Sequence, residues 1–174
     1  MPWPSDGSAN SHRLGRHRFR AGRTMSAARN PAPQRRARPD DPGPDLFAYG
    51  TLQFGPVLDV LLGRTPDMDV AVARGWRVAA LPQRLYPGLV AQPGRMAGGV
   101  VLRGLTAADW RIIEAFEDPE YDLRPIELIG VEQPVRTFVW SAAVTGNDWL
   151  PEVFVSDHLD RYVDRASQWR RERV

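Results

Sequence analysis

One carboxylate of the chain stands where a carboxylate is unfavourable. Apolar residues at positions 112, 113 and 116 mark one face of a predicted helix, and Glu117 follows beside that face at the C-terminal end. A helix C-terminus carries partial negative charge and burial disfavours ionisation, so both should raise the pKa of Glu117. Such a carboxyl group suits a general acid or base near neutral pH. The alternative is a solvated glutamate in an acidic loop, because six acids crowd residues 109–122.

A second stretch has the residue types of an anion-binding turn. Residues 45–55 (DLFAYGTLQFG) begin as a short apolar and aromatic run typical of a buried strand, and they end in turn residues. After the strand, Gly50 can adopt a backbone conformation closed to other residues, so several consecutive N–H groups could point into one concavity. They could hold an anion or a developing oxyanion there. The alternative is a core strand followed by an ordinary turn.

Composition excludes several kinds of site. The 174 residues suffice for one domain with a core. The chain has no Cys, which excludes a thiol nucleophile, a disulfide framework and thiolate metal sites. All 23 basic residues counted as Lys or Arg are Arg, which excludes a Schiff-base lysine and a phosphate-loop lysine.

The charge of the chain is uneven. Residues 1–40 carry nine Arg and two Asp, or +7, whereas residues 41–174 carry 14 Arg and 19 acids, or −5. Pro, Gly, Ser, Ala and Arg dominate residues 1–44, which predicts a disordered tail, and Met25 is an alternative start. An Arg-rich tail of this kind could bind nucleic acid, but we favour a tail without a binding role. No apolar run suits a secretory signal or a membrane span, so we expect a cytoplasmic protein without membrane contact.

The two candidate stretches need a scaffold of short strands and helices. The patterns predict strands over residues 45–49, 69–81 with a bend at Gly75, 97–102, 125–131 and 135–140. They predict helices over residues 56–62 with a stop at Gly63, over 107–116 with a capping box of Thr106 and Asp109, and over 156–173 with Ser156 as a possible cap. Residues 82–93 are expected to form a loop or wide turn that leads into a short strand. Regular strand–helix alternation is missing, so the fold class is α+β.

Together, the stretches indicate a family. Tyr49–Leu52 (Tyr-Gly-Thr-Leu), followed about 65 residues later by Phe116–Tyr121 and then by a strand ending Phe-Val-Trp, resembles the γ-glutamylcyclotransferase-like superfamily. The resemblance is to its AIG2-like branch, which includes γ-glutamylamine cyclotransferases, and it covers residues 45–170. It implies a domain over residues 45–174 with a small mixed β-barrel flanked by helices.

The resemblance also implies an activity and a set of site residues. Members release 5-oxoproline from a γ-glutamyl amine or peptide when the substrate α-amine attacks its own γ-carbonyl. Glu117 would be the general acid and base, and the N–H groups of Gly50, Thr51 and Leu52 would hold the substrate carboxylate or oxyanion. Two cavity-lining tyrosines complete the implied site: Tyr49 and Tyr121.

This chemistry needs no cofactor and no metal, because the substrate supplies the nucleophile. A non-catalytic binding or scaffold protein on the same fold is the alternative. We expect residues 82–93 and 147–154 to shape the pocket, His158 to be a surface or packing residue, and Arg124 to pair with Asp118 or Asp122. The substrate within the γ-glutamyl class and the oligomeric state stay open.

Overall fold

A five-stranded sheet organises the part of the chain that the computed structural model describes, residues 43–173. Four helices and one 3-10 turn connect and cover the strands, so the α+β class is confirmed. In chain order the elements are β1 (Leu46–Ala48), η1 (Thr51–Gln53), α1 (Gly55–Leu62), β2 (Asp67–Ala80), β3 (Pro87–Arg103), α2 (Ala107–Phe116), β4 (Tyr121–Ile126), β5 (Val135–Trp140), α3 (Pro151–Asp157) and α4 (Leu159–Arg171).

The short strand β1 lies at the centre of the sheet. The strand order is β2-β3-β1-β5-β4, with β1 antiparallel to β3 and parallel to β5. Strands β2 and β4 share no ladder among the described residues, so the sheet stays open and the expected barrel is not confirmed. One backbone hydrogen bond, 2.9 Å from Ile129 N to Val72 O, links the β4–β5 connection to the opposite edge strand.

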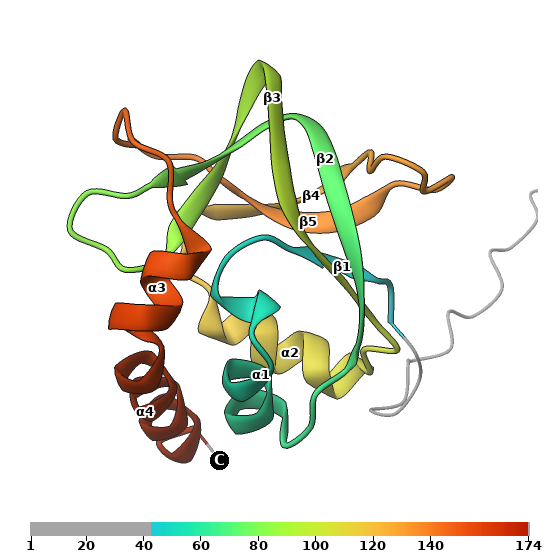
Figure 1. The fold of residues 1–174 in the computed structure, drawn as a ribbon. Coiled ribbons are helices and arrows are strands. Elements are labelled where there is room, and N and C mark those ends of the chain that lie inside the picture. Colours follow the sequence, from blue (N-terminus) through green and yellow to red (C-terminus); the bar gives the residue numbers. More distant parts are fainter. Residues whose placement is uncertain (1–42, 174) are drawn as a thin grey trace, which may run out of the picture. The chain divides into compact units, whose positions relative to one another are not determined.

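The helices gather on one side of the sheet (Figure 1). A large hydrophobic core fills the space between them and the sheet, with Leu46, Leu58 and Ile113 fully buried in it. A second core contains Phe47, Leu89 and residues from all five strands. Since neighbouring residues of β1 serve opposite cores, the residues that follow β1 emerge between two packed layers.

Several local predictions are confirmed. Helix α1 ends at Gly63, whose φ of 73° is left-handed, and β2 carries an irregular register at Gly75, whose φ is 83°. Helix α2 has the predicted bounds, with Thr106 and Asp109 forming the capping box. Strand β5 also has its predicted bounds.

Three local predictions are wrong. The loop or wide turn predicted over residues 82–93 ends before Pro87, where the long strand β3 begins in place of a short strand, because residues 87–91 pair with residues 76–80 of β2. Strand β4 ends at Ile126, so the predicted strand over residues 125–131 is misplaced. The C-terminal helical region is two helices that meet at His158, and Ser156 lies inside α3, where its hydroxyl donates to Val153 O, instead of capping a helix.

The predicted tail falls outside the described residues as far as residue 42, and so does the alternative start Met25. At the first described positions, Gly43 N donates to Leu105 O at 2.6 Å and Pro44 O accepts a hydrogen bond from Trp110 Nε1 at 2.9 Å. These two contacts join the beginning of the described chain to the start of α2. Within residues 43–173, no helix has the length and apolarity that a membrane crossing requires.

Candidate active site

The six residues predicted for the site line a single cavity. It lies where the end of β1 and η1 meet the C-terminal end of α2, the start of β4 and one side of α4. It leaves about 60 Å³ for the centres of water molecules, which is room for about four to six of them. The structure thus brings together residues that are far apart in sequence: Tyr49, Gly50, Thr51, Leu52, Glu117 and Tyr121.

Gly50 begins the turn after β1. Its φ is −109° and its ψ is −139°, a combination outside the extended, right-handed helical and left-handed regions. Close packing also favours glycine here, because a Cβ atom at this position would lie 3.0 Å from Cγ of Pro87. The Pro87 ring therefore packs directly against the backbone of this turn at Gly50.

The turn leaves backbone donors free beside the cavity. The N–H groups of Gly50, Thr51 and Leu52 have no hydrogen-bond acceptor among residues 43–173. The turn itself is closed further along, where Gln53 N donates to Gly50 O at 3.1 Å. Free N–H groups at the start of a helical turn are suited to an anionic oxygen.

Glu117 is the C-terminal cap residue of α2. Its N–H closes the last turn by donating to Ile113 O at 3.1 Å, and its φ of −74° and ψ of 148° lead the chain out of the helix. The residue is half-buried, lines the cavity, and its carboxylate accepts no hydrogen bond from any described residue. Burial, and next the carboxylate of Asp118, raise the pKa of Glu117 from 4.5 to about 8.

The two predicted tyrosines are fixed by hydrogen bonds. The Tyr49 hydroxyl donates to Phe138 O at 2.6 Å and accepts from Leu89 N at 3.2 Å. The Tyr121 hydroxyl donates to Pro87 O at 2.6 Å. Burial, followed by nearby acidic groups that include Glu117, raises the pKa of both hydroxyls, so both stay neutral at physiological pH.

Comparison with known proteins agrees with this geometry. The family model described as "Gamma-glutamyl cyclotransferase, AIG2-like" matches residues 46–173. The chain belongs to this family. AIG2-like protein C of Arabidopsis thaliana is 37% identical over 100 residues, which are 55% of this chain and 58% of that protein, so the alignment spans less than two thirds of the relative.

Solved structures share the fold of this AIG2-like family member. The solution structure of an Arabidopsis thaliana protein superposes with a TM-score of 0.57 at 24% identity, over 75% of this chain and 84% of the other. A structure named gamma-glutamyl cyclotransferase superposes with a TM-score of 0.51 at 12% identity, over 71% and 85% of the two chains. At these identities the likeness concerns the fold alone.

Other cavity-lining residues of the AIG2-like domain were not predicted from the sequence. They are Tyr86, Pro87, Phe116, Asp118, Phe138 and Tyr162, besides residues of β1. Tyr86 and Pro87 lie in the segment 82–93 that was expected to shape the pocket, so aromatic residues in that segment were the available signal. Tyr162 falls in the helix predicted over residues 156–173, with no role in the site expected for it.

Asp118 is held by a cluster at the rim of the cavity. Its carboxylate accepts from the guanidinium of Arg84 and from the hydroxyl of Tyr86. Arg84 also donates to Glu120 Oε1 at 2.8 Å and lies over the ring of Trp140 at 5.2 Å. The cluster joins the β2–β3 loop to the α2–β4 loop, so the positive charge of Arg84 faces Asp118 and Glu120.

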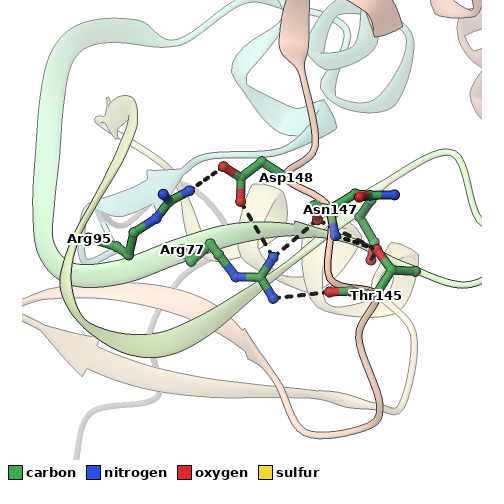
Figure 2. A network of polar contacts seen from close by, with 6 residues as sticks. Arg77, Arg95, Thr145, Asn147 and Asp148 are labelled. Atoms are coloured by element: carbon green, nitrogen blue, oxygen red, sulfur yellow. Dashed lines mark hydrogen bonds and ion pairs between the residues drawn. The ribbon is translucent and has the colours of Figure 1, made fainter.

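The second segment expected to shape the pocket does not line this cavity. Residues 147–149 lie instead against β2 and β3, where Arg77 donates to the carbonyl oxygens of Asn147 and Thr145 at 3.1 Å each, and Phe154 packs in the core beside Tyr162. Asp148 pairs with both Arg77 and Arg95, as Figure 2 shows. This network fixes the loop that leads into α3 rather than forming part of the site.

The remaining predicted side chains lie away from the cavity. Arg124 pairs with Asp122 at 2.7 Å on the surface, which confirms one of its two expected partners. His158 is half-buried where α3 meets α4, with its ring centre 6.4 Å from that of Phe154. Among residues 43–173 there is no group of three or more His, Asp or Glu placed to hold a metal ion.

Proposed function

We propose that this chain is a γ-glutamylcyclotransferase-type enzyme that releases 5-oxoproline from a γ-glutamyl amine or peptide. One observation carries the proposal: a carboxyl group with a pKa of about 8, Glu117, shares a small cavity with the free N–H groups of Gly50, Thr51 and Leu52. A proton carrier that works near neutral pH and a set of oxyanion donors are the two parts that intramolecular aminolysis requires.

The reaction forms one bond and breaks one. The α-amine nitrogen of the substrate bonds to its own γ-carbonyl carbon, and the bond from that carbon to the leaving nitrogen breaks. Glu117 takes a proton from the attacking amine and delivers it to the leaving amine, so atoms balance without water and without a redox change. The backbone donors of the turn stabilise the oxygen that becomes negative between the two steps.

The pKa of Glu117 matches this proton transfer. An α-amino group has a pKa of roughly 7.7–8.0, close to the value of about 8 that burial and Asp118 give to Glu117. The proton can therefore move from amine to carboxylate and back to the leaving nitrogen without a large energy penalty in either direction. A solvated glutamate near its ordinary pKa would be a much weaker base.

The dimensions of the cavity support a γ-glutamyl group as the part that is held. Its space suits a few water molecules or one small amino-acid moiety, rather than a peptide. The leaving amine would then extend past the rim formed by Tyr86 and Asp118. Holding amine and carbonyl together in a small cavity supplies much of the rate, because the reaction is intramolecular.

The decisive experiment measures 5-oxoproline release from γ-glutamyl dipeptides, γ-glutamyl amines and glutathione. We expect turnover of at least one of them by the wild type, and a loss of about a hundredfold or more in Glu117→Gln. Glu114→Gln is the matched control, because Glu114 is an exposed glutamate of the same helix, and it should behave as wild type. Binding of γ-glutamyl compounds without turnover would overturn the proposal in favour of a non-catalytic binding protein.

A further inference from the structure

Four tyrosines line the cavity, and three of their hydroxyl protons are already used within the protein. Tyr49 donates to Phe138 O and Tyr121 donates to Pro87 O, each at 2.6 Å. Tyr86 donates to the carboxylate of Asp118. These hydroxyls have no proton left to give to a bound molecule.

The fourth tyrosine, Tyr162 of α4, differs from the other three. Its hydroxyl oxygen lies 3.2 Å from Oγ1 of Thr51, and neither oxygen has another hydrogen-bond partner among residues 43–173. The pair holds two hydroxyl protons and uses one of them between its own oxygens. Whichever residue donates inside the pair, one O–H is left without an acceptor in the described chain.

A free O–H in this place is costly unless something accepts it. Thr51 is 7% exposed and Tyr162 is 8% exposed, so bulk water has little access to either side chain. Buried polar groups are nearly always hydrogen-bonded in folded proteins, and an unsatisfied one costs about 1–3 kcal/mol. The cavity that both residues line is where an acceptor has room.

We propose that the Thr51–Tyr162 pair donates its remaining hydroxyl proton to an oxygen of the bound substrate, which makes Tyr162 a further catalytic residue. The inference rests on the proposed function, since the acceptor would be a carbonyl or carboxylate oxygen of the γ-glutamyl group. The hydroxyl of Thr51 belongs to the same residue as one of the free N–H groups of the turn. Side-chain and backbone donors thus come from one short segment and its partner on α4.

The surroundings hold the Tyr162 ring in place. It meets the ring of Phe116 edge-on, with centres 6.3 Å apart, and the ring of Phe154 in the same manner at 5.4 Å. Phe116 directly precedes Glu117, so the Tyr162 ring packs against the neighbour of the proposed base. A donor fixed before the substrate arrives loses little free energy to reorganisation during the reaction.

The test removes the hydroxyl groups without removing the packing. Tyr162→Phe keeps the ring, and Thr51→Val keeps the shape of the threonine. We expect kcat/KM for the best substrate to fall about a hundredfold in Tyr162→Phe, and no less in the double variant, while the melting temperature stays near that of wild type. Thr137→Val is the control: Thr137 is fully buried and donates to Phe47 O at 2.8 Å, so this variant should lose stability and keep kcat/KM.

The same assay separates this inference from the proposed function. Wild-type turnover that is abolished in Glu117→Gln but unchanged in Tyr162→Phe would uphold the function and overturn the inference. If the wild type turns over no substrate, calorimetric titration with 5-oxoproline decides the role of the pair. Weaker binding to Tyr162→Phe than to wild type would still support the hydroxyl as a donor, whereas equal or absent binding to both would overturn it.

Discussion

Glu117 and Asp118 are consecutive carboxylates, yet only Asp118 is compensated. Asp118 accepts hydrogen bonds from Arg84 and Tyr86, whereas the Glu117 carboxylate accepts none from the described residues and faces the cavity. The carboxylate of Asp118 contributes to the raised pKa of Glu117. The two residues therefore differ in role: Asp118 is held by partner side chains at the rim, and Glu117 holds a proton near neutral pH.

The raised pKa of Glu117 makes stability depend on pH. Between about pH 4.5 and pH 8 the folded chain binds this proton and the unfolded chain does not, so the unfolding free energy falls as pH rises through this range. The expected fall is about 5 kcal/mol. Glu117→Gln stays neutral and lacks this fall, so it should be more stable than wild type at pH 8–9 and equally stable near pH 4.5. Urea denaturation of both proteins across this range measures the difference.

Glu114→Gln is the control for this prediction, because its carboxylate is exposed on the same helix. Its unfolding free energy should follow the wild-type curve at every pH. Parallel curves for wild type and Glu117→Gln would show that the Glu117 carboxyl is solvated in the folded protein, contrary to its raised pKa.

The pH dependence of activity should move when the neighbour of Glu117 changes. As a base, Glu117 must be ionised, so kcat/KM should rise with pH through about pH 8. Asp118→Asn removes a nearby negative charge, which should lower the pKa of Glu117 and shift this rise by roughly one pH unit to lower pH. Arg84→Gln leaves the Asp118 charge uncompensated, which should shift the rise to higher pH. Turnover measured from pH 6 to pH 10 gives both shifts.

Three tyrosine hydroxyls near Glu117 do not titrate in this range. The hydroxyls of Tyr49, Tyr121 and Tyr162 all have pKa values raised by burial, with Glu117 adding to each shift, and they stay neutral.

Arg124→Gln provides the control for the pH dependence of activity, since Arg124 pairs with Asp122 on the surface. Shifts of the same sign in Asp118→Asn and Arg84→Gln would refute the assigned role of the Asp118 charge.

Local sequence signals predicted those parts of the fold that local interactions determine. The capping box of Thr106 and Asp109 and the left-handed Gly63 depend on residues within a few positions, and both occur as predicted. The first half of β3 does not depend on such signals. Residues 87–93 include two Pro and one Gly, and the pairing of residues 87–91 with β2, which begins with Pro87 opposite Ala80, makes this segment a strand. Tertiary pairing of this kind has no local signature.

The candidate site was predictable to a similar extent. Glu117 could be located because a helix end and an apolar helix face can both be recognised in the sequence. The turn after β1 could be located because its glycine and threonine are typical turn residues. The Thr51–Tyr162 contact joins residues 111 positions apart, and nothing in the helical pattern around Tyr162 separates it from an ordinary core residue. The close approach of Pro87 to Gly50 was missed for the same reason, since Pro87 is distant in sequence.

The close approach of Gly50 to Pro87 gives a prediction for the turn. In Gly50→Ala the new methyl group would lie 3.0 Å and 3.1 Å from two ring carbons of Pro87, so the ring or the turn must shift by a few tenths of an ångström. Because the free N–H groups belong to this turn, we expect activity to fall tenfold or more with a stability loss of only about 1 kcal/mol. Steady-state kinetics and thermal denaturation distinguish the two effects. Wild-type kcat/KM in this variant would show that the turn tolerates the shift.

Two consecutive glycines of β3 test how the sheet fixes the strand that leads into the site. A Cβ atom on Gly99 would overlap the carbonyl oxygen of Ala48 and lie 2.9 Å from the Phe47 ring, whereas a Cβ atom on Gly98 would meet no atom within 4 Å. Neither glycine has a positive φ, so alanine is strained only by contact. We expect Gly99→Ala to lose about 2–3 kcal/mol of unfolding free energy and Gly98→Ala to be neutral or slightly more stable. Because Ala48 ends β1 directly before the turn, Gly99→Ala should also lower activity at temperatures where it remains folded. Equal stability of the two variants would mean that β1 and β3 lie further apart than the structure places them.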